Sequence, residues 1–229
     1  MKYAVTLAVI GVAQLYVARS AGSGAWLLAW SGLSWILAST AYLPVGPRVF
    51  GKRPGGTMAW GSVVLLLPYL LVTWGLWELQ KRLTRERSCH EIAPGLWLGR
   101  RCSAAELPPG IMLVADLTAE FGEPRDVRAG RAYLCLPTMD AAAPSLPGFR
   151  QMVETIAAHP GPVYVHCALG HGRSATVVAA ALAACGQAAS IDEAIQIVRA
   201  ARPGIEINAA QHALLEQWSA DARPNHRAR

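Results

Sequence analysis

Residues 166–174 read HCALGHGRS and bring a cysteine, an arginine and two glycines close together. Cys167 follows the β-branched and aromatic run VYV, and Arg173 precedes an Ala-rich segment, so we expect a strand, a loop and a helix in this order. Such a loop aims backbone N–H groups and the positive end of the helix at one point above the sulfur, which suits a tetrahedral oxyanion. Arg173 can fork two donors onto phosphate oxygens. The same positive field favours the thiolate of Cys167, which makes this residue a candidate nucleophile.

This run resembles the HCxxxxxR signature, followed by Ser or Thr, of the cysteine-based protein tyrosine and dual-specificity phosphatase superfamily. IAPGLWLG at 92–99 is similar to the opening strand of dual-specificity phosphatases, and VADLTAE at 114–120 is similar to their second strand. The resemblance covers about residues 90–220 and none of the apolar N-terminal third. It implies an α/β fold in which a dual-specificity-phosphatase-like sheet is flanked by helices.

The resemblance also implies roles for single residues. A phosphocysteine intermediate forms on Cys167, Ser174 offers its hydroxyl to the sulfur, and His166 supports the loop from beneath without binding a metal. The phosphate-binding loop comprises Ala168, Leu169, Gly170, His171, Gly172 and Arg173. No metal or other cofactor is expected, because the loop amides and Arg173 neutralise the phosphoryl charge.

In this superfamily an aspartate on a separate loop protonates the leaving oxygen, and Asp140 is our candidate. It follows LPTM at 136–139, directly after an expected strand and 27 positions before Cys167. Asp116 lies inside an expected strand and is better suited to a structural role, whereas Asp126 lies in a charged turn. Gln211 could correspond to a water-orienting glutamine of some relatives, but its segment favours a surface position on a helix.

The elements that must position these residues alternate between strands and helices from residue 89 onward, which predicts an α/β sheet with helices on its faces. We expect strands at 95–98, 111–117, 132–136 and 162–167, with Pro137 ending the third. We expect helices at 147–158, 173–185, 190–201 and 208–220, the third opened by the capping box of Ser190 and Glu193.

The N-terminal third has the composition of a membrane anchor. Residues 1–77 contain none of the 15 acidic residues and only five of the 21 basic ones. Apolar runs at 3–18, 24–43 and 58–77 predict two to three transmembrane helices, since about 20 apolar residues cross a bilayer. The first run could instead be a cleaved signal peptide, although Arg19 makes a poor cleavage site. We therefore divide the chain into an anchor (1–79), a basic linker (80–88), a catalytic domain (89–222) and a flexible tail (223–229).

Charge and cysteine content restrict the partners and the compartment. Residues 1–77 supply +5 of the net charge of +6, and the rest of the chain is nearly neutral, so the charge gives no reason to expect nucleic acid. The five cysteines form no CxxC pair, which argues against disulfides and structural zinc. A free reactive thiol keeps better in a reducing compartment, so we expect an integral membrane protein of a bacterial inner membrane with its catalytic domain in the cytoplasm.

The sequence is compatible with three functions. VYVHC followed by RSATVVAA is similar to mitochondrial-type and bacterial relatives that dephosphorylate phosphatidylglycerophosphate, and an anchor raises the local concentration of a lipid substrate. We therefore favour a phosphomonoester hydrolase acting on a phospholipid head group. The alternatives are a tyrosine or dual-specificity phosphatase acting on phosphoproteins, and a module that binds phosphate without turnover.

Overall fold

The computed structural model describes residues 2–222, and the chain forms two compact units. The first unit comprises the residues up to Arg85 together with the short segment 119–122. The second unit comprises 86–118 and the chain from Glu123 onward, and it contains the predicted catalytic elements. The tail predicted at 223–229 lies outside the described residues.

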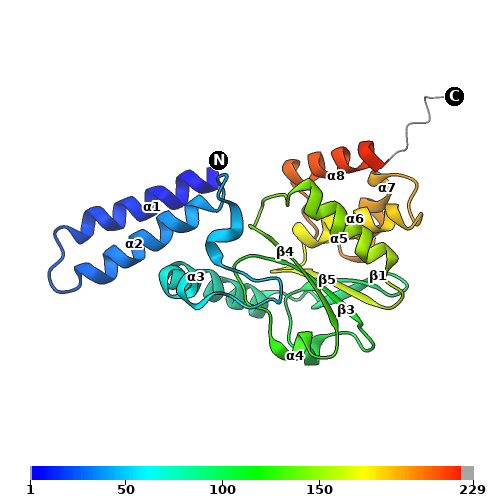
Figure 1. Cartoon of the computed structure of the whole chain (residues 1–229), viewed down its shortest axis with the longest axis horizontal. Coiled ribbons are helices and arrows are strands. Elements are labelled where there is room, and N and C mark those ends of the chain that lie inside the picture. Colours follow the sequence, from blue (N-terminus) through cyan, green and yellow to red (C-terminus); the bar gives the residue numbers. More distant parts are fainter. Residues whose placement is uncertain (1, 223–229) are drawn as a thin grey trace. The chain divides into compact units, whose positions relative to one another are not determined.

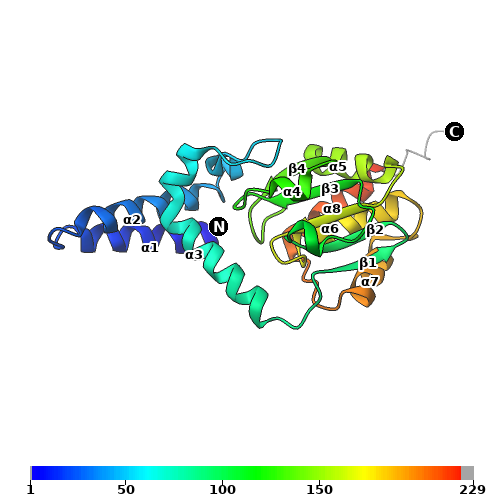
Figure 2. The same cartoon turned by 90° about the horizontal axis from the view of Figure 1, so that it is seen from below.

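The first unit is built from apolar helices. They are α1 (Lys2–Ala18), α2 (Ala25–Thr40), a short 3-10 helix (Gly46–Phe50) and α3 (Trp60–Leu83). Helices α1 and α2 run side by side in both Figure 1 and Figure 2. They approach closely at two glycines, because a Cβ on Gly11 would lie 2.5 Å from the carbonyl oxygen of Gly32. Small residues at a helix crossing are typical of membrane proteins.

A proline inside α3 leaves one backbone carbonyl without its helical partner, and side chains of α2 bind this carbonyl and a neighbouring amide. Pro68 has no N–H to donate to the carbonyl of Val64, and the indole of Trp30 donates to that carbonyl at 3.2 Å. The amide of Tyr69 donates to the hydroxyl of Ser34 at 3.2 Å. Such side-chain partners are what a broken helix needs where water is scarce.

Among the described residues, α3 is the one helix long and apolar enough to cross a membrane, by length and composition. Its 24 residues compare with 17 in α1 and 16 in α2, which fall short of the usual 20. The anchor of two to three transmembrane helices therefore remains a prediction. Helix α3 ends at Leu83, so the first residues of the predicted linker 80–88 are helical.

The second unit is an α/β domain, as predicted, and its mixed sheet has five strands. Its strands are β1 (Cys89–Ala93), β2 (Leu96–Arg100), β3 (Leu113–Thr118), β4 (Ala132–Thr138) and β5 (Val163–Cys167), in the order β1-β2-β5-β3-β4. β1 and β2 are antiparallel, and the other neighbours are parallel. The helices are α4 (Arg125–Arg128), α5 (Leu146–Ala158), α6 (Arg173–Ala184), α7 (Ile191–Ala201) and α8 (Ala209–Ala222). In Figure 1, α5 to α8 gather on one side of the sheet and α4 lies on the other.

Two local predictions were wrong. β1 was not expected as a strand of its own, and it forms a hairpin with β2 across Gly95. Pro137 does not end its strand, because β4 is an edge strand whose free side tolerates a residue without an N–H. By contrast, Asp126 is exposed in the single turn of α4, in agreement with the predicted charged turn, and its carboxylate accepts from the Val127 amide.

The side-chain alternation of β5 explains how the site is divided between the two faces of the sheet. Val163, Val165 and Cys167 belong to the larger core, which is shared with α5 to α8. Tyr164 belongs to the smaller core on the opposite face, and His166 follows at the same parity. The strand therefore presents the thiol toward α6 and the imidazole toward the other face.

Candidate active site

The chain between β5 and α6 wraps around the sulfur of Cys167, as the sequence predicted. The amide of Gly170 points at Sγ from 3.3 Å, and the hydroxyl of Ser174 lies 3.2 Å from Sγ. Both Cys167 and Ser174 are almost completely buried, with 3% and 0% of their surface exposed. Two donors aimed at one sulfur stabilise negative charge on it, which is what a thiolate nucleophile requires.

Gly170 gives the loop its sharp turn. Its φ is +78°, and a Cβ there would lie 2.5 Å from the carbonyl carbon and oxygen of Gly99, at the end of β2. Only glycine satisfies both the dihedral and the space. Gly172 then precedes α6, and its carbonyl accepts from the Thr176 amide at 3.0 Å, so the helix begins directly behind the loop.

Arg173 connects the loop to the predicted acid. Its side chain is buried, and Nη1 donates to the carbonyl of Thr138 at the end of β4, 2.7 Å away. Nη2 lies 3.2 Å from Oδ1 of Asp140, whose side chain is 80% exposed. The structure thus brings Asp140 to the arginine of the loop, although the two residues are 33 positions apart. Asp116, the competing candidate, is fully buried in β3 and cannot reach the same side.

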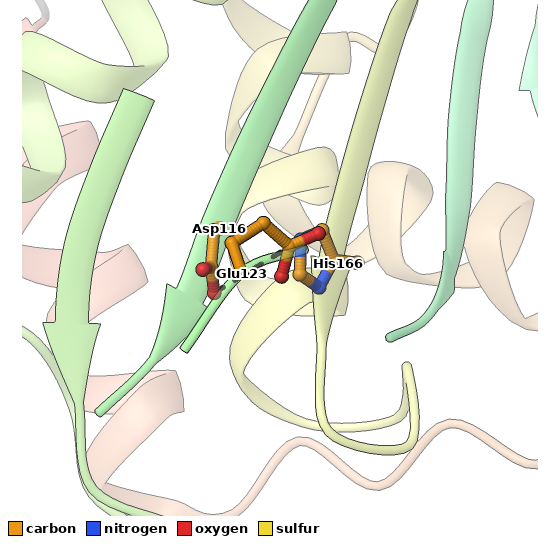
Figure 3. Close-up of side chains that lie close together, drawn as sticks. All are labelled: Asp116, Glu123 and His166. Atoms are coloured by element: carbon orange, nitrogen blue, oxygen red, sulfur yellow. Dashed lines mark ion pairs between the residues drawn. The ribbon is translucent and has the colours of Figure 1, made fainter. Parts of the chain in front are cut away.

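His166 lies beneath the loop in a cluster with two carboxylates (Figure 3). Its Nε2 is 3.5 Å from Oε1 of Glu123 and 4.0 Å from Oδ1 of Asp116. All three side chains are at most 1% exposed. Nδ1 of the ring lies 3.4 Å from the carbonyl oxygen of Cys167, so the cluster contacts the backbone that carries the nucleophile.

The cluster contains ligand types that zinc accepts, and its ligand atoms lie within 4.8 Å of one another. The carboxylate of Asp116 is already committed, however. Its Oδ1 accepts from the amide and hydroxyl of Thr118 at 2.7 and 2.8 Å, and its Oδ2 accepts from the Tyr133 hydroxyl at 2.6 Å. A metal would have to replace these hydrogen bonds, so the donor set fits a buried polar cluster better than a metal centre.

A buried arginine at the C-terminal end of α7, Arg202, holds the outer side of the loop, and no local sequence pattern indicated this role. Arg202 donates through Nε to the carbonyl of Gly170 and through Nη2 to the carbonyl of Leu169, both at 2.9 Å. Nη2 also donates to Glu86 at 2.9 Å, and Glu86 lies 2.6 Å from Nε2 of His171. Two carbonyls are therefore turned outward, which leaves the loop amides free to turn inward.

Burial and neighbouring charges shift the pKa values of Arg202 and of the adjacent His90. Burial lowers the pKa of the Arg202 guanidinium, and the negative charge of Glu86 opposes this effect. Burial and the charge of Arg202 lower the pKa of His90, whose Nδ1 lies 3.0 Å from Nη1 of Arg202. Neutral His90 can accept this hydrogen bond, whereas protonated His90 would repel the guanidinium.

The remaining loop residues lie where the sequence placed them. The carbonyls of Cys167 and Ala168 both accept from the amide of Arg101, at 2.8 and 3.2 Å, which ties the loop to the end of β2.

Burial raises the pKa of the thiol of Cys102, a nearby cysteine in the smaller core, to about 12. Cys102 is therefore protonated at neutral pH and unsuited to attack.

The expectation of a surface position for Gln211 was wrong. Gln211 is 1% exposed, and its amide donates to the carbonyl of Ala142, two residues after Asp140, at 3.2 Å. Asn208 was not singled out at all, yet its side chain donates to the carbonyl of Ala141 at 2.9 Å. Both contacts join parts of the chain that are almost 70 residues apart, so local sequence patterns could not reveal them.

Comparison with known proteins supports a cysteine-dependent phosphatase. Residues 108–221 match the family model described as dual specificity phosphatase, catalytic domain. No curated protein matches the chain significantly.

Several solved structures share the fold of the second unit. The human tyrosine phosphatase-like serine/threonine/tyrosine-interacting protein is 28% identical with a TM-score of 0.53, and the match covers 59% of this chain and 98% of that one. PTPMT1 in complex with PI(5)P is 26% identical with a TM-score of 0.53, over 58% of this chain and 96% of that one. Tk-PTP in the active form is 26% identical with a TM-score of 0.52, over 58% and 97%. The matched part of this chain therefore corresponds to nearly the whole of each of these proteins.

Proposed function

Because the second unit of this chain is the catalytic domain of a cysteine-dependent phosphatase, we propose that the protein is a membrane-anchored hydrolase of phospholipid phosphomonoesters. The observation that carries the proposal is the union, in one chain, of the Cys167 loop with an apolar helix of 24 residues. The neighbour PTPMT1, whose structure holds PI(5)P, supports a lipid head group as the substrate class.

The anchor half of the proposal is supported by the surface of the first unit. Large apolar side chains on its helices are exposed, among them Tyr16 at 73%, Trp26 at 63% and Trp60 at 79%. Exposed apolar area of this extent fits contact with lipid tails, and the Trp and Tyr side chains suit the headgroup region. Arg85 and Arg87 follow α3, and we expect them to attract the domain toward anionic lipid.

The reaction proceeds in two displacements. The thiolate of Cys167 attacks phosphorus and forms the S–P bond while the P–O bond to the leaving group breaks, and Asp140 gives its proton to the leaving oxygen. Water then attacks phosphorus, Asp140 takes a proton from it, and the S–P bond breaks to release phosphate and restore the thiolate. Gly170 and Ser174 hold the sulfur charge before and after this cycle.

We further place the catalytic domain on the cytoplasmic side of a bacterial inner membrane. All five cysteines are free, which suits a reducing compartment. Cys185 is exposed and offers a test, since a membrane-impermeant maleimide should label it only after the cell membrane has been permeabilised. Labelling of Cys185 in intact spheroplasts would place the domain outside.

The substrate class is tested with the full-length protein in lipid-detergent micelles. Phosphate release is measured from phosphatidylglycerophosphate, phosphatidylinositol phosphates and phosphopeptides, with Cys167→Ser as the blank. We expect one lipid to exceed every peptide by about a hundredfold in kcat/KM, which is about 2.7 kcal/mol at the transition state. A preference for phosphopeptides would make the protein a tethered protein phosphatase, and no release from any substrate would favour a phosphate-binding module.

A further inference from the structure

The residue that follows the candidate acid has an unusual backbone conformation. Ala141 has a φ of +56°, and it is the one non-glycine residue with a positive φ within residues 2–222. This left-handed region disfavours every residue that has a Cβ, so an alanine adopts it where surrounding contacts impose it. The contacts that impose it therefore bear on the position of Asp140.

Two side chains at the start of α8 supply these contacts. Nδ2 of Asn208 donates to the carbonyl of Ala141 at 2.9 Å, and Nε2 of Gln211 donates to the carbonyl of Ala142 at 3.2 Å. Two successive carbonyls of the acid loop are thus bound by two amide side chains one helical turn apart. We call Asn208 and Gln211 together the amide clamp.

The orientation of the clamp is fixed by hydrogen bonds within it. Oδ1 of Asn208 accepts from the amides of Ala210 and Gln211 at 3.0 and 3.1 Å, as a helix cap does. Oε1 of Gln211 accepts from the amide of Asn208 at 3.1 Å. Since each oxygen is bound to the start of α8, each NH₂ group must face the acid loop.

The clamp also lies against the phosphate-binding loop. A Cβ on Gly172 would lie 3.1 Å from Oε1 and 3.2 Å from Nε2 of Gln211, so the amide of Gln211 packs directly on this glycine. Gly172 precedes Arg173, whose Nη2 lies 3.2 Å from Asp140. One buried amide therefore contacts both segments that must meet during catalysis.

We propose that Asn208 and Gln211 are positioning residues that hold the acid loop against the phosphate-binding loop, with Asp140 ready to protonate the leaving oxygen. The inference rests on the proposed role of Asp140 as the acid. The clamp touches no reacting atom, and it acts through the carbonyls of Ala141 and Ala142. Its loss should weaken the contribution of the acid and leave the nucleophile intact.

Two substitutions break the clamp and keep the rest of each side chain. Asn208→Asp retains the oxygen that caps α8, and Gln211→Glu retains the oxygen that accepts from Asn208, while each replaces the donor to the acid loop by an acceptor. Gln217→Glu on the exposed face of α8 is the matched control for the added charge. The melting temperature of each full-length variant shows whether the fold is kept.

The readout is the dependence of kcat/KM on the leaving group. An aryl phosphate with an activated leaving group needs little help from an acid, whereas an alkyl phosphate needs much. We expect each clamp variant to lose about 3- to 10-fold on the alkyl phosphate, the worth of one hydrogen bond, and less than about twofold on the aryl phosphate. Gln217→Glu should match the wild type on both, and a clamp variant combined with Asp140→Asn should lose little more than Asp140→Asn alone.

Equal losses on both substrates, or losses that add fully to those of Asp140→Asn, would overturn the clamp and assign these amides a purely structural role. The failure of the proposed acid has a different signature. In that case Asp140→Asn itself would show no dependence on the leaving group, and the clamp would fall with it. If the protein released no phosphate from either substrate, the proposed function would be the part refuted.

Discussion

The phosphate-binding loop should collapse on the addition of one methyl group at Gly170. Gly170→Ala meets two obstacles: a φ of +78°, and a Cβ position 2.5 Å from the backbone of Gly99 and 2.8 Å from the amide of Arg100. The left-handed conformation costs an alanine about 1–2 kcal/mol. The clash is with backbone and cannot be relieved by rotating a side chain, so it adds about 1–3 kcal/mol. Together these effects predict a loss of about 2–5 kcal/mol of stability.

Gly110 provides the matched control for this substitution. It has nearly the same φ, +77°, and nothing within 4 Å of its Cβ position, so Gly110→Ala carries the dihedral cost alone. Thermal unfolding of the full-length protein should show a small loss for Gly110→Ala and a loss about two to three times larger for Gly170→Ala. Phosphatase activity should be kept in the first variant and fall at least about a hundredfold in the second, because the displaced Gly170 amide no longer faces Cys167. Equal stability losses and equal activities would refute the described loop conformation.

Three further outcomes are expected. Ser174→Ala should release alcohol in a rapid burst and then turn over about 10- to 150-fold more slowly than the wild type. The reason is that the sulfur loses a charge-assisted hydrogen bond as it leaves phosphorus. A single linear phase at the wild-type rate would argue against this role of Ser174. The pKa of His90 is lower in the folded state, so as the pH falls the unfolded state takes up a proton before the folded state does. The His90 contribution to stability should therefore be full above about pH 6.5 and decrease as the pH drops below it. The melting temperature of His90→Asn should depend less on pH in this range, and an unchanged pH dependence would assign the effect to other groups. Glu86→Gln should cost about 1–2 kcal/mol of stability and raise KM for phosphomonoesters, since Arg202 loses its charged partner. A variant with unchanged stability and an unchanged KM would show that the ion pair of Glu86 and Arg202 is dispensable.

The sequence identified the nucleophile loop because the whole of it is local. The end of a strand, two glycines and the start of a helix lie within about ten residues, and the cysteine, the glycines and the arginine in this order are typical of a phosphate-binding loop. Cys167, Arg173 and Ser174 lie as the pattern predicted, and Asp140 lies beside Arg173. The alternating strand also explains why His166 faces away from the thiol.

The residues that the sequence did not reveal depend on distant partners. Glu86 was assigned to the linker because nothing near it in sequence signals a contact, and its partners Arg202 and His171 come 116 and 85 residues later. Gln211 was assigned to the surface for the same reason. Proline in a sequence normally predicts the end of a strand, but the edge strand β4 tolerates Pro137, and only the folded sheet establishes this edge position.

The central claim, that phosphate transfer passes through the sulfur of Cys167, is tested most directly by trapping the intermediate. The full-length protein is mixed with ³²P-labelled substrate, denatured with detergent at alkaline pH and digested at that pH, and the labelled peptide is identified by mass spectrometry. Cys102→Ser, which alters another buried thiol, is the matched control and should trap label like the wild type. We expect label on the peptide that contains Cys167, with the lability of a thiol phosphate in mild acid, and none in Cys167→Ser. Label on any other residue, or undiminished turnover by Cys167→Ser, would contradict it.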